Sequence, residues 1–489
     1  MAELILPGVY IEVRAEALIV PGPVSVGNIG IVGTAATGPA VTSPTDLLDK
    51  VKVLGSYAEA REIYGPYDAF ETPLTANNPL TLVRALELAY SNGASTVYAV
   101  RVAANTATPA EPAAGDMLGN ATIFDLKAKY PGTLGNNITV SISDKPPTEV
   151  VVTLKAGTLE ETYTVKNGTD LVKAINESSN LVTAKTHVNA ANKPVVITDV
   201  KFAGGTNGAD AADSDYANGL AALLNQNAHI IVAAGQADNV IGDEMLAHVN
   251  NASTDKVRRD RIGVIGSRAK AANQDASAFI GVAGKPAVAG ERIIYVMPGI
   301  RATDAPGLKA AGETAPPKPK EVTLPGSYAA AAIAGMLSAR DPHISLTNKA
   351  VSAAGLEVEF TSAQLEGLIQ SGVLALEKRR GFRIVKGITT DTGAFQQITT
   401  RRIVDFAKFG VRSAAEPFIG LLNNDRVRKA LKGSINGFLA DMVTDEMLVS
   451  YELDVTATRD EEIRGIARVT MTLRPTFSID YIKVVMFLG

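Results

Sequence analysis

The sequence predicts an α/β protein built on a mostly parallel sheet, with a β-rich insert and an α+β region at the C-terminal end. Three observations predict this class. Apolar strands alternate with helices in two separate stretches, which implies parallel crossovers and a sheet covered on both faces. Short alternating strands occupy the residues between these stretches. Both ends of the chain alternate with a period of two, as half-buried strands do.

The first 25 residues are predicted to form a strand arm. Val9, Ile11 and Val13 alternate with larger polar side chains, as in a half-buried strand. Residues 21–23 read Pro-Gly-Pro, and such a cluster would detach the strand from the domain that follows. We therefore expect residues 1–25 to be a short arm.

Residues 26–105 are predicted to be the first part of the α/β core. The apolar run over 28–36 is typical of a buried strand, 80–91 has one apolar helical face, and 95–102 is again a strand. Residues 103–115 are rich in Ala, Pro and Thr, a composition typical of a linker between domains.

An inserted β-sandwich domain is predicted over residues 106–205, because strands this short and closely spaced are typical of a small sandwich. Its strands are expected at 121–129, 137–143, 150–154, 161–165 and 194–200. The α/β pattern returns over 206–364, so the insert interrupts one domain. There, strands are expected at 229–234, 261–266 and 292–297, and helices at 239–250, 268–282 and 327–339.

Residues 365–489 are predicted to form a C-terminal domain with three helical patterns before the closing strands. The helix over 401–414 has one apolar and one charged face. Asn424 or Asp425 is expected to cap the next helix. The buried stripe of that helix is predicted to be Val427, Leu431, Ile435, Phe438 and Leu439.

The last residues alternate like a strand from Ala467 to Leu473, and a second strand is predicted after Pro475, which must lie at an edge or a break. This segment is either the last strand of the chain's own sheet or an arm that pairs with a neighbouring subunit. Exposed strand ends promote aggregation unless something pairs with them, so two such ends indicate an ordered polymer. The predicted inter-subunit strands contain Val9, Ile11, Val13, Ala467, Val469, Met471, Leu473, Ile479, Ile482 and Val484.

Composition excludes several functional classes. The net charge of -4 argues against a nucleic-acid coat or a polybasic membrane binder. The chain has no cysteine, which excludes disulfides, thiolate metal sites and cysteine nucleophiles. No apolar stretch has the length of a membrane span, and we expect neither an export signal nor a membrane anchor, so that the chain folds in a cytosol.

Charge is unevenly distributed along the chain. Residues 376–435 contain 13 Lys and Arg against 5 Asp and Glu, a net charge of +8. Because the whole chain has a net charge of -4, the other residues together carry -12. This region is either a solvated helical face or a surface for an acidic partner. Nucleic acid is the less favoured partner, because Phe406 and Phe409 have the pattern of core residues.

One serine has the spacing of a hydrolase nucleophile. Gly326-Ser327 followed by Ala334-Gly335 matches the spacing of subtilisin-type proteases. A triad also needs a histidine and an aspartate, and none of the four histidines lies in a His-Gly-Thr sequence at the start of a helix. The alternative interpretation is that Ser327 caps a helix. Gly204-Gly205 is interpreted as a turn, and Asp213 and Asp215 as residues at a helix start rather than metal ligands.

Taken together, short motifs spread over nearly the whole chain resemble the contractile tail sheath proteins of myophages and related contractile particles. The motifs are Pro7 to Tyr10, Val32 to Ala35, Gly38-Pro39, Asn92 to Ala94, residues 97–98 and 100–102, Tyr130 to Gly132, residues 135–137, Gly204-Gly205, residues 325–327, Ala334-Gly335, Arg340, Arg401-Arg402 and Arg464-Gly465.

This resemblance implies a core similar to the subtilisin fold without its activity, an inserted β-sandwich, a C-terminal domain beside a tail tube, and terminal strand arms exchanged between subunits. It implies a helical array of stacked hexameric rings whose partners are the tail tube, baseplate and tail terminator proteins, with no nucleic acid, membrane insertion or cofactor. Candidates to face the tube are Arg401, Lys408, Arg412, Arg426 and Lys429.

We therefore expect a structural subunit, not an enzyme, located in a virion tail and assembled in the host cytoplasm. It would polymerise around a tube and contract once to drive that tube through a cell envelope. Two alternatives stay open: a subtilisin-related serine hydrolase, and a non-contractile surface assembly protein.

Overall fold

The computed structural model describes residues 27–66, 80–157, 159–304 and 320–488, so the strand predicted at Val9 to Val13 lies outside the described residues. The chain divides into two units. The larger unit contains residues 26–398 together with 480–489. The described part of the smaller unit is residues 399–479, which we call the C-terminal unit.

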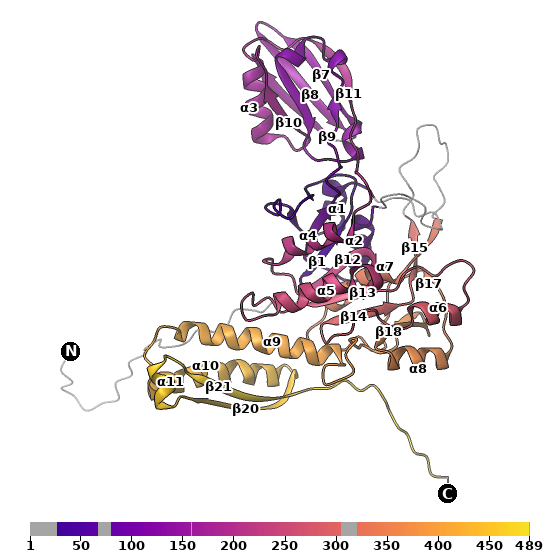
Figure 1. Cartoon of the computed structure of the whole chain (residues 1–489), viewed down its shortest axis with the longest axis vertical. Coiled ribbons are helices and arrows are strands. Elements are labelled where there is room, and N and C mark those ends of the chain that lie inside the picture. Colours follow the sequence, from indigo (N-terminus) through magenta and orange to yellow (C-terminus); the bar gives the residue numbers. More distant parts are fainter. Residues whose placement is uncertain (1–26, 67–79, 158, 305–319, 489) are drawn as a thin grey trace, which may run out of the picture. The chain divides into compact units, whose positions relative to one another are not determined.

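The larger unit contains a sheet of nine described strands, in the order β19, β18, β14, β13, β12, β1, β4, β2, with β3 paired to β4 (Figure 1). The central strand β1 (Ile29–Gly33) pairs in parallel with β12 (Ile230–Ala237) and β4 (Val97–Val102). This confirms the predicted α/β class with a largely parallel sheet. The other strands are β2 (Ala40–Val41), β3 (Val51–Leu54), β13 (Ile262–Gly266), β14 (Ile293–Met297), β18 (Val373–Lys378) and β19 (Phe382–Ile384).

Helices cover both faces of this sheet, as its continuously apolar strands require. Ile29 and Ile31 join one apolar cluster with α1, α2 and α7, whereas Val32 and Ile231 join a second cluster with α4, α5, α6 and α8. The helices are α1 (Tyr57–Tyr64), α2 (Leu82–Ser91), α4 (Asp213–Leu223), α5 (Asp238–Ala252), α6 (Ala276–Ala283), α7 (Gly326–Ser338) and α8 (Ser362–Gln370).

The helix predicted over 268–282 is shorter than expected. It begins as α6 at Ala276, because Asp275 caps it by accepting a hydrogen bond from the Ala278 amide at 2.7 Å. A separate three-stranded sheet joins β16 (Lys320–Leu324), β15 (Ile300–Asp304) and β17 (Gly355–Leu356) in this order.

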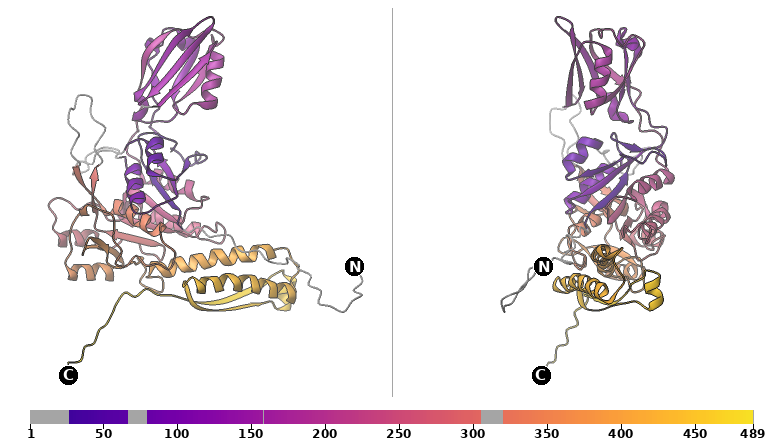
Figure 2. Two further views of the ribbon diagram at one scale, coloured as in Figure 1. Left: turned by 180° about the vertical axis from the view of Figure 1, so that it is seen from behind. Right: turned by 90° about the vertical axis from the view of Figure 1, so that its left-hand side faces the viewer.

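The insert contains a five-stranded sheet in the order β5, β11, β7, β8, β9 and a two-stranded sheet of β10 and β6. It also contains a helix that the sequence analysis missed, α3 (Gly168–Ser178), which lies against the strands (Figure 2). Asn167 caps this helix, and Leu171, Val172 and Ile175 bury one face of it. The strands are β5 (Glu111–Pro112), β6 (Phe124–Ala128), β7 (Ile138–Lys145), β8 (Glu149–Ala156), β9 (Leu159–Val165), β10 (Val182–Thr186) and β11 (Ile197–Ala203).

The C-terminal unit packs two long helices against a β-hairpin. The helices are α9 (Ile398–Ala415) and α10 (Asp425–Thr444), and the hairpin consists of β20 (Leu448–Thr456) and β21 (Arg468–Pro475), joined through α11 (Arg459–Ile463). Asn424 caps α10 by accepting from the Val427 amide at 3.0 Å, as predicted. The predicted stripe is buried at Leu431, Ile435, Phe438 and Leu439, and only partly buried at Val427.

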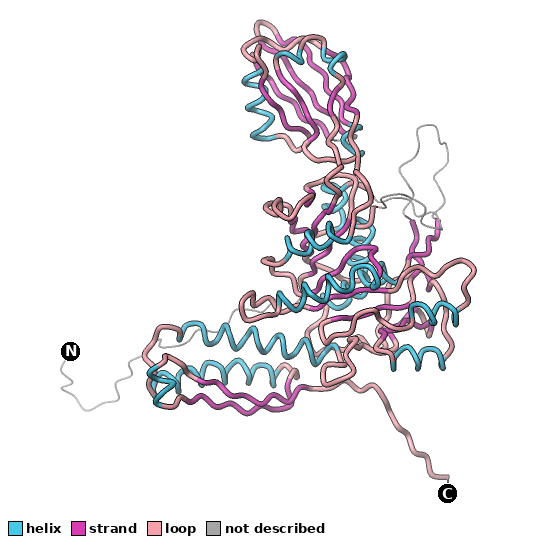
Figure 3. Tube along the Cα trace, in the orientation of Figure 1, coloured by secondary structure: helices cyan, strands magenta, loops and turns pink. Residues whose placement is uncertain are grey.

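The second closing strand is a wrong prediction for the single chain. Residues 476–488 form no strand, and Figure 3 colours them as loop up to the end of the described chain. A strand needs a partner for its backbone groups, and no described strand pairs with this segment. None of the described helices combines the length and apolarity needed to cross a membrane.

Candidate functional site

The serine considered as a nucleophile lies buried in the first turn of α7. Ser327 is 1% exposed, and its Oγ has no hydrogen-bond partner among the described residues. A serine nucleophile needs a hydrogen-bonded base and access to substrate, and this position provides neither. The interpretation as a helix cap is also wrong, because Pro325 is the N-cap residue and no side chain caps the helix.

Close packing of α7 against α2 explains the second part of the serine motif, Ala334-Gly335. A Cβ added at Gly335 of α7 would lie 2.2 Å from the carbonyl oxygen of Ala89 on α2. A Cβ added at Gly93, just beyond α2, would lie 2.9 Å from the Cβ of Ala339. The motifs at residues 92–94 and 334–335 therefore meet where α2 and α7 touch, and only small residues fit there.

The weaker site candidates have structural explanations. Asp215 accepts a hydrogen bond from the Ala212 amide at 2.9 Å, which confirms its place at a helix start. Gly205 exchanges two hydrogen bonds with the Asn136 side chain, at 2.8 and 2.9 Å, and the preceding Gly204 has a φ of 77°, a backbone conformation that glycine adopts without strain. Among the described residues, no group of three His, Asp or Glu side chains could hold a metal ion.

A buried arginine connects the core to the base of the insert. Arg101 on β4 is 0% exposed, and its Nη1 donates to the carbonyl oxygens of Gly38 at 2.8 Å and Pro131 at 2.7 Å. Gly132 approaches the core so closely that a Cβ would lie 2.1 Å from the carbonyl oxygen of Ala36. Burial lowers the pKa of Arg101 to about 10, so the guanidinium keeps its charge at neutral pH. Three motifs that are far apart in the sequence thus meet here, and nothing in their spacing could have shown this.

The hairpin of the C-terminal unit has two open edges, because β20 and β21 pair only with each other among the described strands. Tyr451, Leu453, Val469 and Leu473 pack against the apolar cluster of α9 and α10 but stay partly exposed. Packing against the helices supports the hairpin, but its two strands leave these side chains incompletely covered. The hairpin therefore has free backbone groups and uncovered apolar surface for additional strands.

The predicted inter-subunit strand of the C-terminal end has two structurally different halves. The first half, residues 467–473, belongs largely to β21: Val469, Met471 and Leu473 pair with Val455, Leu453 and Tyr451 of β20 in the same chain. Ala467 lies just before this strand. The second half is uncovered, since Ile479, Ile482 and Val484 are 80%, 82% and 72% exposed. The two interpretations left open by the sequence thus each fit one half: the first belongs to the chain's own sheet, and the second has no partner strand within the described chain.

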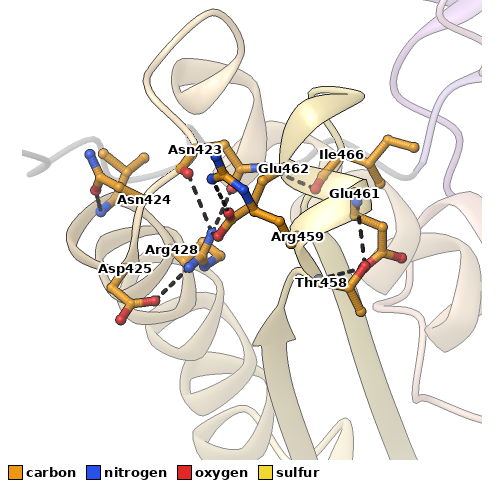
Figure 4. Close-up of polar contacts among 10 residues, drawn as sticks. Asn423, Asn424, Asp425, Arg428, Thr458, Arg459, Glu461, Glu462 and Ile466 are labelled. Carbon is orange, nitrogen blue, oxygen red and sulfur yellow. Dashed lines mark hydrogen bonds and ion pairs between the residues drawn. The ribbon is translucent and has the colours of Figure 1, made fainter.

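A polar network fixes the turn between the two hairpin strands (Figure 4). Arg428 of α10 donates to Glu462 of α11 at 2.9 Å and to Asp425 at 2.5 Å. The Asn423 amide donates to the carbonyl oxygen of Ile466 at 2.9 Å. Because these contacts join the loop before α10 to the turn before β21, they fix the direction in which β21 starts.

The predicted basic surface is smaller in the structure. Arg401 is 4% exposed and pairs with Asp405 at 2.7 Å, so its charge is compensated within the chain. Lys408 and Arg412 are partly buried, whereas Arg426 and Lys429 in the first turns of α10 are exposed. The free basic charge of this set therefore lies mainly at the start of α10.

Two family models match the chain. One, described as the phage tail sheath protein central domain, matches residues 209–390, and the other, described as the phage tail sheath C-terminal domain, matches residues 390–488. Together they span more than half of the chain. No curated protein sequence matches it.

Solved structures share the fold at low sequence identity. A sheath tail protein from Desulfitobacterium hafniense is 17% identical with a TM-score of 0.64, over 96% of this chain and 100% of that chain. A sheath tail protein from Listeria innocua is 15% identical with a TM-score of 0.66, over 94% and 93%. The helical sheath of the anti-feeding prophage in its contracted state is 14% identical with a TM-score of 0.52, over 99% of both chains.

Proposed function

Since the chain belongs to the phage tail sheath protein family and is a structural subunit of a contractile tail sheath, we propose that it polymerises by strand exchange around an inner tail tube. The observations that carry this proposal are the open hairpin of the C-terminal unit and the exposed apolar side chains that follow it in sequence, which pair with no strand among the described residues. In the polymer, residues 482–488 of one copy add to the hairpin edge of the next, and residues 1–14 form the other exchanged strand.

Strand exchange suits an assembly that changes shape. Contacts that run head to tail without closing generate a helix. Ladder hydrogen bonds between strands persist while the packed domains rotate as rigid bodies, so subunits stay linked during contraction. The energy is stored in the metastable extended array, and no nucleotide is required.

The proposal also covers the symmetry of the assembly, its partner proteins and the type of core fold. We propose stacked hexameric rings, assembled in the host cytoplasm, that meet baseplate and terminator proteins at the ends and drive the tube through a cell envelope. The exposed Arg426 and Lys429 face an acidic tube, and the partly buried Lys408 and Arg412 add to the same contact. The core is a subtilisin-like fold without activity, which the buried position of Ser327 supports.

Negative-stain microscopy of the purified chain tests the proposal. The full chain should form tubes, whereas chains that lack residues 1–14 or 482–489 should remain monomeric with nearly unchanged melting temperatures. Tubes formed by either truncated chain would contradict strand exchange. Labelling of Ser327 by a fluorophosphonate would contradict a purely structural role.

A further inference from the structure

Residues 480–488, which we call the C-terminal segment, are held to the rest of the larger unit through the carboxylate of Asp480. Asp480 accepts hydrogen bonds from the Thr347 hydroxyl and from the Gln397 side-chain amide, both at 3.2 Å. Lys386 Nζ lies 3.7 Å from the same carboxylate, whose side chain is 9% exposed. The Thr347 hydroxyl is itself held in place, because it accepts from the Gly387 amide at 3.1 Å. Hydrogen bonds to an ionised group are the stronger kind.

The next residue strengthens the attachment. Lys386 Nζ lies 3.5 Å from the Tyr481 hydroxyl and 5.4 Å from the centre of its ring, within range of a cation–π interaction. We call Thr347, Lys386, Gln397, Asp480 and Tyr481 the clasp.

Burial in this segment is the reverse of the usual pattern. The carboxylate of Asp480 is buried, whereas the apolar side chains that surround it in sequence are open to solvent, with Ile479 80%, Ile482 82% and Phe487 91% exposed. Folding of one chain normally buries apolar groups and leaves carboxylates in water. The clasp therefore holds an apolar segment at a fixed root without covering it.

The clasp also joins the two points at which the described part of the chain crosses between the units. The chain leaves the larger unit after Ile398 and returns to it at Asp480. Gln397 stands directly before the first crossing, and its hydrogen bond to Asp480 ties it to the second. The root of the segment consequently belongs to the larger unit, although the preceding residues belong to the C-terminal unit.

We propose that the clasp is an anchor that fixes the root of the C-terminal arm to the α/β core, so that only residues 482–488 reach a second copy of this chain. This inference rests on the proposed strand exchange. In extended form these residues span about 23 Å at about 3.3 Å each. The link between subunits then runs from the core of one copy to the hairpin of the next, and each C-terminal unit can turn without pulling on its own arm.

The test compares full-length chains with Asp480→Ala, Asp480→Asn and Lys386→Met. Lys349→Met is the matched control, because Lys349 is an exposed lysine two residues from Thr347. A nitroxide on Ile482→Cys reports the mobility of the root in the monomer, and the chain has no other cysteine. Asp480→Ala should make the root mobile and raise the concentration needed for tube formation at least tenfold. Asp480→Asn and Lys386→Met should have smaller effects in the same direction, and Lys349→Met none.

Unchanged root mobility and tube formation in Asp480→Ala would overturn the clasp. A chain without residues 482–489 separates the two proposals. If that chain still forms tubes, strand exchange itself is wrong. If it does not, while Asp480→Ala assembles like the unmodified chain, strand exchange stands and the clasp alone is wrong. Should Asp480→Ala fail to fold, the same comparisons are made with Lys386→Met.

Discussion

The core sheet and the hairpin of the C-terminal unit are both sheets covered by helices, but only the core sheet is complete within one chain. All residues of β1 are buried, whereas β21 alternates between exposed and partly buried residues along its whole length. A sheet buried on both faces stabilises its own chain. A hairpin with open edges has unpaired backbone groups that can pair with a strand of another chain. Under the proposed strand exchange, folding of the monomer depends on the core sheet, and assembly depends on the hairpin.

The helices differ in the same way. In α7, all residues from Gly326 to Leu337 are buried, and its glycines are in close contact with neighbouring backbone. In α10, Gly433 and Gly437 have no atom within 4 Å of the place where a Cβ would stand. Glycine weakens a helix compared with alanine. In α7 this cost is offset by close packing, whereas a Cβ added at Gly433 or Gly437 of α10 would meet nothing among the described residues.

The largest expected effect comes from replacing one glycine in each helix by alanine. Gly335→Ala forces a Cβ against the Ala89 carbonyl and should lower the free energy of unfolding by about 3 kcal/mol or more. Gly433→Ala should raise it by about 1 kcal/mol. Urea unfolding of both variants checks this, and equal effects would remove the distinction between the two helices.

Acid should destabilise the core through a buried histidine. His248 is 8% exposed, with its Nε2 3.0 Å from Arg261 Nη1. Burial, and next the charge of Arg261, lower its pKa from 6.5 to about 3. Between these two values the unfolded chain binds a proton that the folded chain does not, so stability falls as the pH drops below 6.5. This group should contribute a loss of about 2 kcal/mol between pH 7 and pH 5.

His248→Gln is the matched variant, because its side-chain oxygen can still accept from Arg261. Its urea unfolding should lose less stability between pH 7 and pH 5 than that of the unmodified chain. An identical pH dependence in both chains would contradict the role of His248.

A side chain of the open hairpin should matter more in the polymer than in the monomer. Leu473 is only partly buried against the helices of its own chain. Leu473→Ala should therefore lower monomer stability by about 1 kcal/mol, less than a fully buried leucine would. If an added strand covers it, the same change should weaken tube formation further, which light scattering against concentration measures. A loss confined to the monomer would show that the hairpin is already complete.

The smallest effect on the monomer is expected from reversing surface charge. Arg426→Glu with Lys429→Glu should change monomer stability by less than about 0.5 kcal/mol, because both side chains are exposed. Assembly around an acidic tube should weaken, most clearly at low salt. The control is Lys166→Glu with Lys185→Glu on the insert, two exposed lysines that should leave assembly unchanged. Equal effects of the two pairs would argue against a basic contact surface on α10.

The sequence alone determined what depends on neighbouring residues. Apolar runs set the core strands, the cap at Asn424 set the start of α10, and the spacing of Leu431, Ile435 and Leu439 set its buried face. These features follow from periodicity and from hydrogen bonds within one helical turn. The order of the short motifs was also enough to indicate the family, although each motif alone was weak.

Only the tertiary structure decided what depends on residues far apart in the chain. The burial of Ser327, the pairing of Arg401, the contact of Arg101 with Pro131 and the clasp at Asp480 have no trace in local patterns. The strand predicted after Pro475 failed for the same reason: alternation shows that a segment can be a strand, but the ladder requires a partner, and within one described chain there is none.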